Sequence, residues 1–325
     1  MAADTSAAAP CRQLRGVDFS SAPTRRKPVV LAEGELLPAP GRGPGQAQPA
    51  GATPVTTDPD TADTDTDTDT GTGTDASRPV PPATVRLHSL RRLPSLADYA
   101  ATLAEPGPWV GAFDLPFGLP RELVETLGWP TGWLALMQHY RQLDRAQIRA
   151  QFAAFCNARP AGRKFAHRAC DGPAGSSPSM KWVNPPVAWM LHAGVPPLID
   201  AGCELPGLHA GDPARVALEA YPGLLAREVL GRRPYKSDTP ARQDAGRRTA
   251  RADLVDALQA GRTRLGLRLV LSTTQRDELV DEPQGDLLDA TLCLLQAGWA
   301  SLRPGWGLPG DVDPLEGWIV SAQQP

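Results

Sequence analysis

The stretch LRGVDFSSA, residues 14–22, places one acidic side chain inside a short run of apolar and small residues. We interpret it as a buried strand, with residues 27–37 (KPVVLAEGELL) as its hairpin partner. An ionised carboxylate in a buried strand costs several kcal/mol unless it is paired or bound to a metal ion. Asp18 is therefore expected to have a cationic partner, and the rest of the chain must supply one.

Strands and helices are expected to alternate outward from this stretch. Apolar runs bounded by turn residues predict strands at 14–22, 27–37, 83–93, 108–120, 214–223 and 316–320. Apolar residues at helical spacing predict helices at 95–105, where Ser95 is the cap, and at 121–156, 224–231, 239–261 and 285–301. Residues 157–210 are expected to be rich in loops. This order predicts an α/β layer architecture.

The composition narrows the class of protein. A chain of 325 residues with 41% hydrophobic content can bury a substantial core. The sequence has no apolar run of membrane-spanning length, and its N-terminus lacks the apolar core of a signal peptide. The five cysteines are scattered and lack CxxC spacing, which favours reduced thiols over disulfides or a zinc site. We therefore expect a cytoplasmic protein that does not contact membranes.

Residues 38–82 form a low-complexity tract rich in Pro, Gly, Thr and Asp. This composition predicts a disordered insertion. Residues 1–13 are also expected to be disordered, so the folded domain is expected to span 14–325 around the insertion. The formal net charge of −3 includes seven aspartates within residues 56–75, so the remainder of the chain is mildly basic. A mildly basic body is compatible with nucleic acid as a partner without requiring it.

Two further acids lie in apolar strands. Asp114 ends the run GAFD and Glu219 ends the run VALE. Arg25, Arg163 or Lys236 could neutralise any one of these acids in a structural ion pair. Three such strand acids in one chain favour a shared metal site over three separate ion pairs.

The stretch GDLLDATLCLLQAGW, residues 285–299, opens an apolar helix with two aspartates one turn apart. Asp286 is a reasonable N-cap, and acids in the first turn suit the helix dipole, so the stretch alone favours capping. The alternative is that Asp286 and Asp289 hold a metal ion together with the strand acids.

The ends of neighbouring strands in an open α/β sheet lie along one edge. Asp18 and Asp114 on adjacent strands, with Asp286 and Asp289 from a helix packed over that edge, would converge on a small volume. Four like charges this close need a counter-charge, and Mg²⁺ or Mn²⁺ binds carboxylate oxygens readily. Two such ions about 4 Å apart can activate water and stabilise the leaving oxygen in phosphodiester cleavage.

These residues resemble ribonuclease H-like nucleases, especially the Holliday-junction resolvase branch. Seven segments in order resemble a family of predicted ribonuclease H-like nucleases called domain of unknown function 429. They are GVDFSSAP, FDLPFGLP, KWVNPPVAWM, LEAYPGLLAREV, RPYK, DLLDA and GLPGDVDPLEGWIV. The resemblance runs from about residue 14 to 320 apart from the acidic insertion. It implies a ribonuclease H-like mixed sheet flanked by helices, with residues 119–210 as a helical and loop-rich cap.

The resemblance also implies roles for individual acids. Asp18 would be the central metal ligand and Asp114 the ligand from the second strand. Asp289, helped or replaced by Asp286, would complete the cluster. Glu219 would be a further ligand or a base that orients the attacking water. The implied activity is a nuclease that depends on Mg²⁺ or Mn²⁺ and acts on DNA or RNA.

Other residues have weaker claims. Ribonuclease H proper has a glutamate on its first helix, whereas this chain offers only Asp98 and Glu105 there, which favours the resolvase-like arrangement. Lys236 in RPYK could stabilise a phosphate or developing charge, although a surface lysine after a turn explains it equally well. Arg168, with its basic neighbours at 163 and 164, could line a path for a phosphate backbone.

Two other classes of function remain open. Actin-like kinases and ATPases share the expected strand order, but their first phosphate-binding loop is rich in Gly and Thr, and DFSSAPTRRK has no glycine. They also repeat the module, and no second strand like GVDFS is present. The other class is a non-catalytic protein that keeps the ribonuclease H fold and uses its acids for structure or ligand binding.

Overall fold

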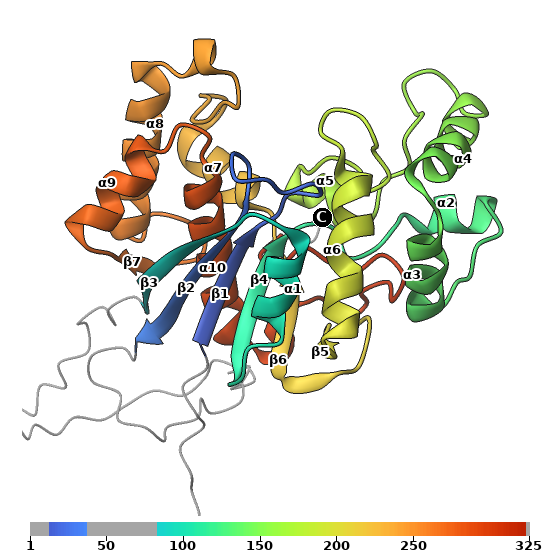
Figure 1. Ribbon diagram of the computed structural model, residues 1–325, viewed down its shortest axis with the longest axis horizontal. Coiled ribbons are helices and arrows are strands. Elements are labelled where there is room, and N and C mark those ends of the chain that lie inside the picture. The colour runs from blue at the N-terminus through green and yellow to red at the C-terminus, as the bar shows by residue number, and fades with distance from the viewer. Residues whose placement is uncertain (1–12, 38–82, 323–325) are drawn as a thin grey trace, which may run out of the picture.

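The computed structural model describes residues 13–37 and 83–322 and has an α/β fold with a seven-stranded mixed sheet flanked by helices (Figure 1). The predicted disordered segments fall on residues 1–12 and 38–82, which lie outside the described residues, as do 323–325. Gln13, expected in the N-terminal tail, is the first residue of a strand instead. Within the described ranges no helix is both long and apolar enough to cross a membrane.

The strands lie in the order β5-β6-β4-β1-β2-β3-β7. Their bounds are β1 Gln13–Asp18, β2 Val29–Leu37, β3 Thr84–Leu93, β4 Trp109–Asp114, β5 Cys203–Glu204, β6 Asp212–Glu219 and β7 Arg268–Val270. All of them run parallel except β2, which is antiparallel to both of its neighbours. The carboxyl ends of β1, β4 and β6 therefore meet at one edge of the sheet.

The helices fall into groups around the sheet. Their bounds are α1 Leu96–Leu103, α2 Arg121–Thr126, α3 Trp133–Gln142, α4 Arg145–Asn157, α5 Asp171–Ala174, α6 Val187–Asp200, α7 Pro222–Leu230, α8 Ala245–Gln259, α9 Thr273–Asp281 and α10 Asp286–Ser301. In Figure 1, α2–α6 lie to the right of the sheet, α8 and α9 to its left, and α10 runs behind it. Two short 3₁₀ helices cover Pro240–Arg242 and Pro304–Gly307.

Successive side chains along each strand point to opposite faces of the sheet, so the core has two layers. In β2, Val29 and Leu31 pack with α1 and α6 on one face, whereas Val30 and Ala32 pack with α10 on the other. The α10 face is unusually close to β1 at Gly16. A Cβ atom there would lie 2.1 Å from the carbonyl oxygen of Ala290 on α10. Glycine at this position is therefore what allows α10 to lie directly on β1.

The predicted elements agree with the structure for most of the sheet. Five predicted strands contain β2, β3 and β4 and most of β1 and β6. Ser95 caps α1 as predicted, by accepting a hydrogen bond from the Asp98 amide at 3.1 Å. The prediction of a final strand at 316–320 is wrong, because only an isolated bridge joins Ile319 to Glu219. The N-cap of α10 is Gly285, with φ of 79°, and Asp286 is the first helical residue.

The expected loop-rich character of 157–210 is wrong for its second half, where α6 spans 14 residues and includes Pro196 and Pro197. Proline inside a helix removes backbone hydrogen bonds, but Leu191, Val195 and Leu198 are fully buried against the core. Burial of these three apolar side chains outweighs the lost hydrogen bonds.

Candidate functional site

Three acids end three neighbouring strands. Asp18 is the last residue of β1, Asp114 of β4 and Glu219 of β6. Asp18 and Asp114 are direct register partners in the parallel β1–β4 pair. The fold thus brings all three carboxylates to the same edge of the sheet, where ligand sites of open α/β sheets assemble.

The strand acids face different layers, however. Asp18 lies two residues beyond Gly16, and Asp114 two residues beyond Ala112, so both lie on the α10 face. Glu219 shares its face with Ala217, which packs in the opposite layer. Strand alternation therefore separates Glu219 from the other two strand acids.

Helix α10 adds two acids to Asp18 and Asp114. Asp289 is fully buried in its first turn, and Asp286 is 7% exposed. Burial raises the pKa of Asp18 well above its usual range, and the negative charges of Asp289 and Asp286 raise it further. Four of the predicted site acids thus form one cluster, which we call the acid cluster: Asp18, Asp114, Asp286 and Asp289.

The acid cluster holds more negative charge than its surroundings neutralise. Burial, and next the charge of Asp289, raise the pKa of Asp114 to about 7. Burial and the nearby Glu282 raise the pKa of Asp286 to about 6. Near neutral pH these carboxyls therefore retain protons for part of the time, which is the expected response of acids that are buried close to one another.

One cation already touches the cluster. The Lys236 ammonium forms an ion pair with Oδ2 of Asp289, and the Tyr235 hydroxyl donates a hydrogen bond to Oδ1 at 2.5 Å. Burial opposes the charge of Lys236, yet the attraction of Asp289 raises its pKa well above its usual range. Lys236, expected to stabilise a phosphate or to lie on the surface, is thus positioned on an acid, with its side chain 43% exposed.

The loop that carries Lys236 packs against the start of α10. Gly285 has a positive φ of 79°, and a Cβ atom there would lie 2.7 Å from Cβ of Lys236. Glycine therefore serves both the left-handed backbone and the close approach of the lysine. The RPYK segment is in this way fixed beside the acid cluster.

Glu219 has a separate partner. Arg168 donates from Nη1 to Oε2 at 2.7 Å and from Nη2 to Oε1 at 2.6 Å, and the Phe117 amide donates to Oε2 at 2.9 Å. Arg168 also binds Asp171, and both residues are buried. Both oxygens of Glu219 are occupied, which argues against its expected role as metal ligand or base.

The same ion pair corrects two further expectations. Arg168 is 3% exposed, so it does not line a surface path for a phosphate backbone. It is also the partner of a strand acid, whereas the sequence suggested Arg25, Arg163 or Lys236. Glu105, expected on the first helix, lies just beyond the end of α1 and pairs with Arg15 and Arg91, away from Asp18.

The donors of the acid cluster suit Mg²⁺ or Mn²⁺ in kind, because both are hard ions that prefer carboxylate oxygen. In the described part of the chain, no three His, Cys, Asp or Glu side chains are arranged so that they could hold a metal ion. In addition, both carboxylate oxygens of Asp289 are taken, one by Tyr235 and the other by Lys236. Metal binding at this edge therefore requires Lys236 to leave Asp289.

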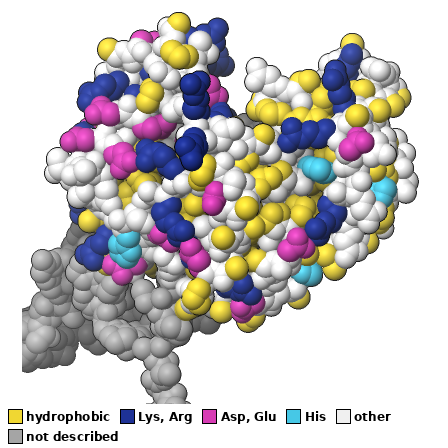
Figure 2. Space-filling model, in the orientation of Figure 1, with side chains coloured by type: hydrophobic (Ala, Val, Ile, Leu, Met, Phe, Trp, Pro, Cys, Tyr) yellow, Lys and Arg dark blue, Asp and Glu magenta, His cyan; other side chains and the backbone are white. Residues whose placement is uncertain are grey.

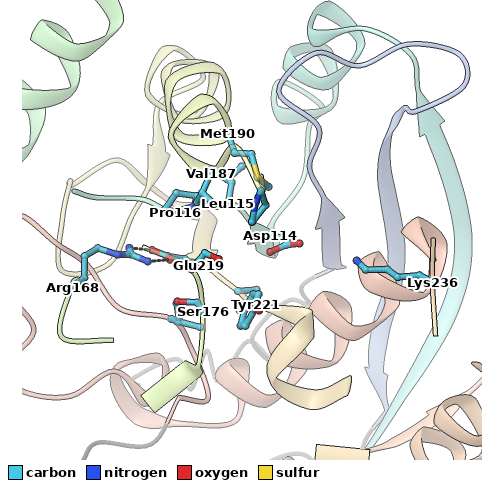
Figure 3. A pocket seen from close by; sticks show the side chains of 14 residues that line it. Asp114, Leu115, Pro116, Arg168, Ser176, Val187, Met190, Glu219, Tyr221 and Lys236 are labelled. Atoms are coloured by element: carbon cyan, nitrogen blue, oxygen red, sulfur yellow. Dashed lines mark hydrogen bonds and ion pairs between the residues drawn. The ribbon is translucent and has the colours of Figure 1, made fainter. Parts of the chain in front are cut away.

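Two cavities open beside the acid cluster. The first, of about 240 Å³, is walled mainly by apolar side chains and is called here the apolar cavity: Leu115, Pro116, Val187, Met190 and Ile319 (Figure 3). The second, of about 220 Å³, is called the basic cavity after Arg227, Arg233 and Lys236. Asp114, Tyr221 and Lys236 border both cavities, so the two meet at the acid cluster.

Comparison with known proteins gives no relative for this chain: no family model, no curated protein and no solved structure matches it. The class that the structure itself defines is an α/β protein with a mixed seven-stranded sheet. The acid cluster and its two cavities carry the functional argument.

Proposed function

We propose that this protein is a divalent-metal-dependent nuclease with a ribonuclease H-like fold. The observation that carries the proposal is the acid cluster, where burial and the negative charge of Asp289 on α10 raise the pKa of Asp18 and Asp114 at the carboxyl ends of adjacent parallel strands. Groups held at such an energetic cost are concentrated at functional sites.

The topology supports the proposed fold. The central strands lie in the order β3-β2-β1-β4-β6, and β2 alone is antiparallel to its neighbours. This is the arrangement expected for a ribonuclease H-like sheet. The resemblance of the seven sequence segments to the family of domain of unknown function 429 points to the same fold.

Asp18, Asp114, Asp286 and Asp289 are the residues that would hold Mg²⁺ or Mn²⁺. The bound ion supplies a Lewis acid and a water of lowered pKa for phosphodiester hydrolysis. Lys236 borders both cavities, and once released from Asp289 its ammonium would be available to an incoming phosphate. In Figure 3 the ammonium end of Lys236 points toward Asp114.

The surface around the site supports nucleic acid as the partner. Figure 2 shows a hollow between the two groups of helices, with Lys and Arg side chains on both sides of it. Arg227 and Arg233 line the basic cavity next to the acid cluster. Cations beside a carboxylate-held metal are the arrangement that a phosphate backbone requires.

The test is a calorimetric titration of Mn²⁺ into wild type, Asp18→Asn and Asp277→Asn. Asp277 is an exposed aspartate on α9 and serves as the matched control. Wild type and the control are expected to bind Mn²⁺ alike, and Asp18→Asn at least tenfold more weakly. A cleavage screen of single strands, branched DNA and RNA–DNA hybrids follows, with Asp114→Asn as the blank. Equal Mn²⁺ binding by all three proteins refutes the proposal.

The ion pair at Asp289 favours one alternative, a non-catalytic protein of the same fold in which Lys236 permanently takes the place of the metal. The calorimetric experiment separates the two. Under this alternative wild type binds no Mn²⁺, and Lys236→Met creates binding that wild type lacks.

A further inference from the structure

The two cavities differ in chemistry although they meet at the same acids. Asp114 and Tyr221 form the shared wall, with the apolar cavity on one side and the basic cavity on the other. A ligand that fills both must therefore carry an apolar, compact group and an anionic group on either side of the acid cluster. The reactive centre between them would lie at Asp114.

The apolar cavity suits a single flat ring system. At about 240 Å³ it is smaller than the usual site for a drug-sized ligand. Two of the charged residues that line it, Arg168 and Glu219, are paired with each other, and the other cation that lines it, Lys236, is paired with Asp289 where the two cavities meet. Hydrophobic walls from α6 and from the segment that follows β4, with the lining cations paired, are the features of a pocket for an unstacked base.

Tyr221 is held in place between the cavities. Arg227 lies 5.1 Å above its ring and donates a hydrogen bond to its hydroxyl at 3.1 Å. Arg227 itself is fixed, because it also donates to the carbonyl oxygen of Ala174 at 2.6 Å. A preordered aromatic side chain at the mouth of an apolar cavity is a stacking platform for a base.

The basic cavity suits the adjoining phosphate. It presents Arg233 and Lys236, and Arg233 is exposed and forms an ion pair with the exposed Asp253. A surface ion pair between half-exposed side chains is weak, so a phosphate can compete for Arg233.

We infer that the site takes an unpaired nucleotide, with its base in the apolar cavity and the neighbouring phosphate in the basic cavity. A base that is stacked and paired in a continuous duplex cannot enter the apolar cavity, so the substrate class is single-stranded or locally unpaired nucleic acid. The identity of the reacting phosphate at Asp114 rests on the proposed function, whereas the binding of the base does not.

The experiment measures binding by fluorescence anisotropy with Ca²⁺ present. The probes are a labelled single strand, the duplex of the same length, and the single strand with one abasic position, each as DNA and RNA. Wild type is expected to bind the single strand about tenfold more tightly than the duplex, and the abasic strand about tenfold more weakly, since one base stack contributes about 1–3 kcal/mol. Val187→Trp places a large side chain in the apolar cavity and is expected to bind the single strand about tenfold more weakly than wild type.

Val183→Trp is the matched control, because Val183 is 49% exposed nearby and does not line the cavity. It is expected to bind as wild type does. Arg233→Ala is expected to lower the slope of log affinity against log salt by about 0.7. Arg232→Ala changes the neighbouring residue in sequence, which does not line the basic cavity, and is expected to lower the slope by less. The abasic strand requires no mutation, so the test does not depend on the folding of any variant.

The inference is overturned if wild type binds duplex or abasic strand as tightly as the intact single strand, or if the two tryptophan variants bind alike. Specific binding of the single strand without cleavage in Mg²⁺ or Mn²⁺ supports the inference and counts against the nuclease. Cleavage of duplex at the rate of single strand, with Val187→Trp fully active, refutes the inference and leaves the nuclease standing.

Discussion

Removing one charge from the acid cluster should stabilise the metal-free protein. Asp114→Asn is the informative variant, because asparagine keeps the shape of the side chain but cannot ionise. The carboxyl of Asp114 is half-buried beside Asp289, and burial with that neighbouring charge raises its pKa from 3.8 to about 7. Ionisation of Asp114 in the folded protein therefore costs free energy that ionisation in the unfolded chain does not.

The sign and size of the effect follow from this shift. A raised pKa means that the stabilising contribution of Asp114 is complete below pH 3.8 and is lost as the pH rises to about 7. At about 1.4 kcal/mol for each unit of pKa, the loss is at most about 4 kcal/mol. Because Asp114 lines two open cavities, solvent screening reduces it, and we expect about 2 kcal/mol.

The assay is urea unfolding of wild type, Asp114→Asn and the control Asp277→Asn at about pH 4.5 and about pH 8, in EDTA. The gain in stability of Asp114→Asn over wild type should be small at the lower pH and about 2 kcal/mol at the higher pH. Asp277→Asn should follow wild type at both, since Asp277 is exposed on α9.

Addition of Mg²⁺ makes the prediction stricter. At a hundredfold excess over its dissociation constant a ligand stabilises the folded state by about 2.7 kcal/mol. Mg²⁺ should therefore raise the stability of wild type at about pH 8. It should raise that of Asp114→Asn much less. If Asp114→Asn is no more stable than wild type at the higher pH in EDTA, the acids are not crowded, and the reasoning behind the metal site fails.

Three further changes test single contacts. In urea unfolding, Lys236→Met should destabilise the metal-free protein by about 2 kcal/mol, because Asp289 loses its cation. In calorimetry the same variant should bind Mn²⁺ more tightly than wild type. Weaker Mn²⁺ binding would contradict this. Arg168→Met should lower the free energy of unfolding by about 3–5 kcal/mol, because Glu219 is left buried and unpaired. Adding Glu219→Gln should recover part of this loss of stability. If the double variant is no more stable than Arg168→Met, the ion pair is not the cause. Gly16→Ala should lower the melting temperature by several degrees, since its Cβ would lie 2.1 Å from a backbone oxygen of α10; an unchanged melting curve would rule out that contact.

The sheet was largely predictable because its central strands carry strong local patterns. Runs such as VVLAEGELL and WVGAFD are apolar and bounded by turn residues, which local sequence encodes. Strand β7 has only three residues, too few for a pattern. Helix α9 was missed because it is mostly polar, although Ser272 and Gln275 form a capping box that signals its start.

The site was predictable only in part, for a physical reason that Glu219 illustrates. The sequence predicts its position at a strand end. The second half of β6 is buried on both faces, however, so its apolar run does not reveal which face Glu219 occupies. The partner, Arg168, is 51 residues away along the chain. Long-range pairing of this kind depends on how α5 and the C-terminal segment pack, which no local pattern specifies.

The charge balance at Asp289 bears on the choice between a catalytic and a structural role. If Lys236 were the intended counter-ion of the whole acid cluster, its presence would keep the neighbouring carboxyls readily ionised. Instead the pKa values of Asp18, Asp114 and Asp286 are raised with Lys236 already in place. A purely structural network would be more stable with one acid fewer, and the Asp114→Asn prediction states this as a gain in the free energy of unfolding. The proposed cation site rests on these raised pKa values, and the Asp114→Asn experiment measures what the crowded acids cost in stability.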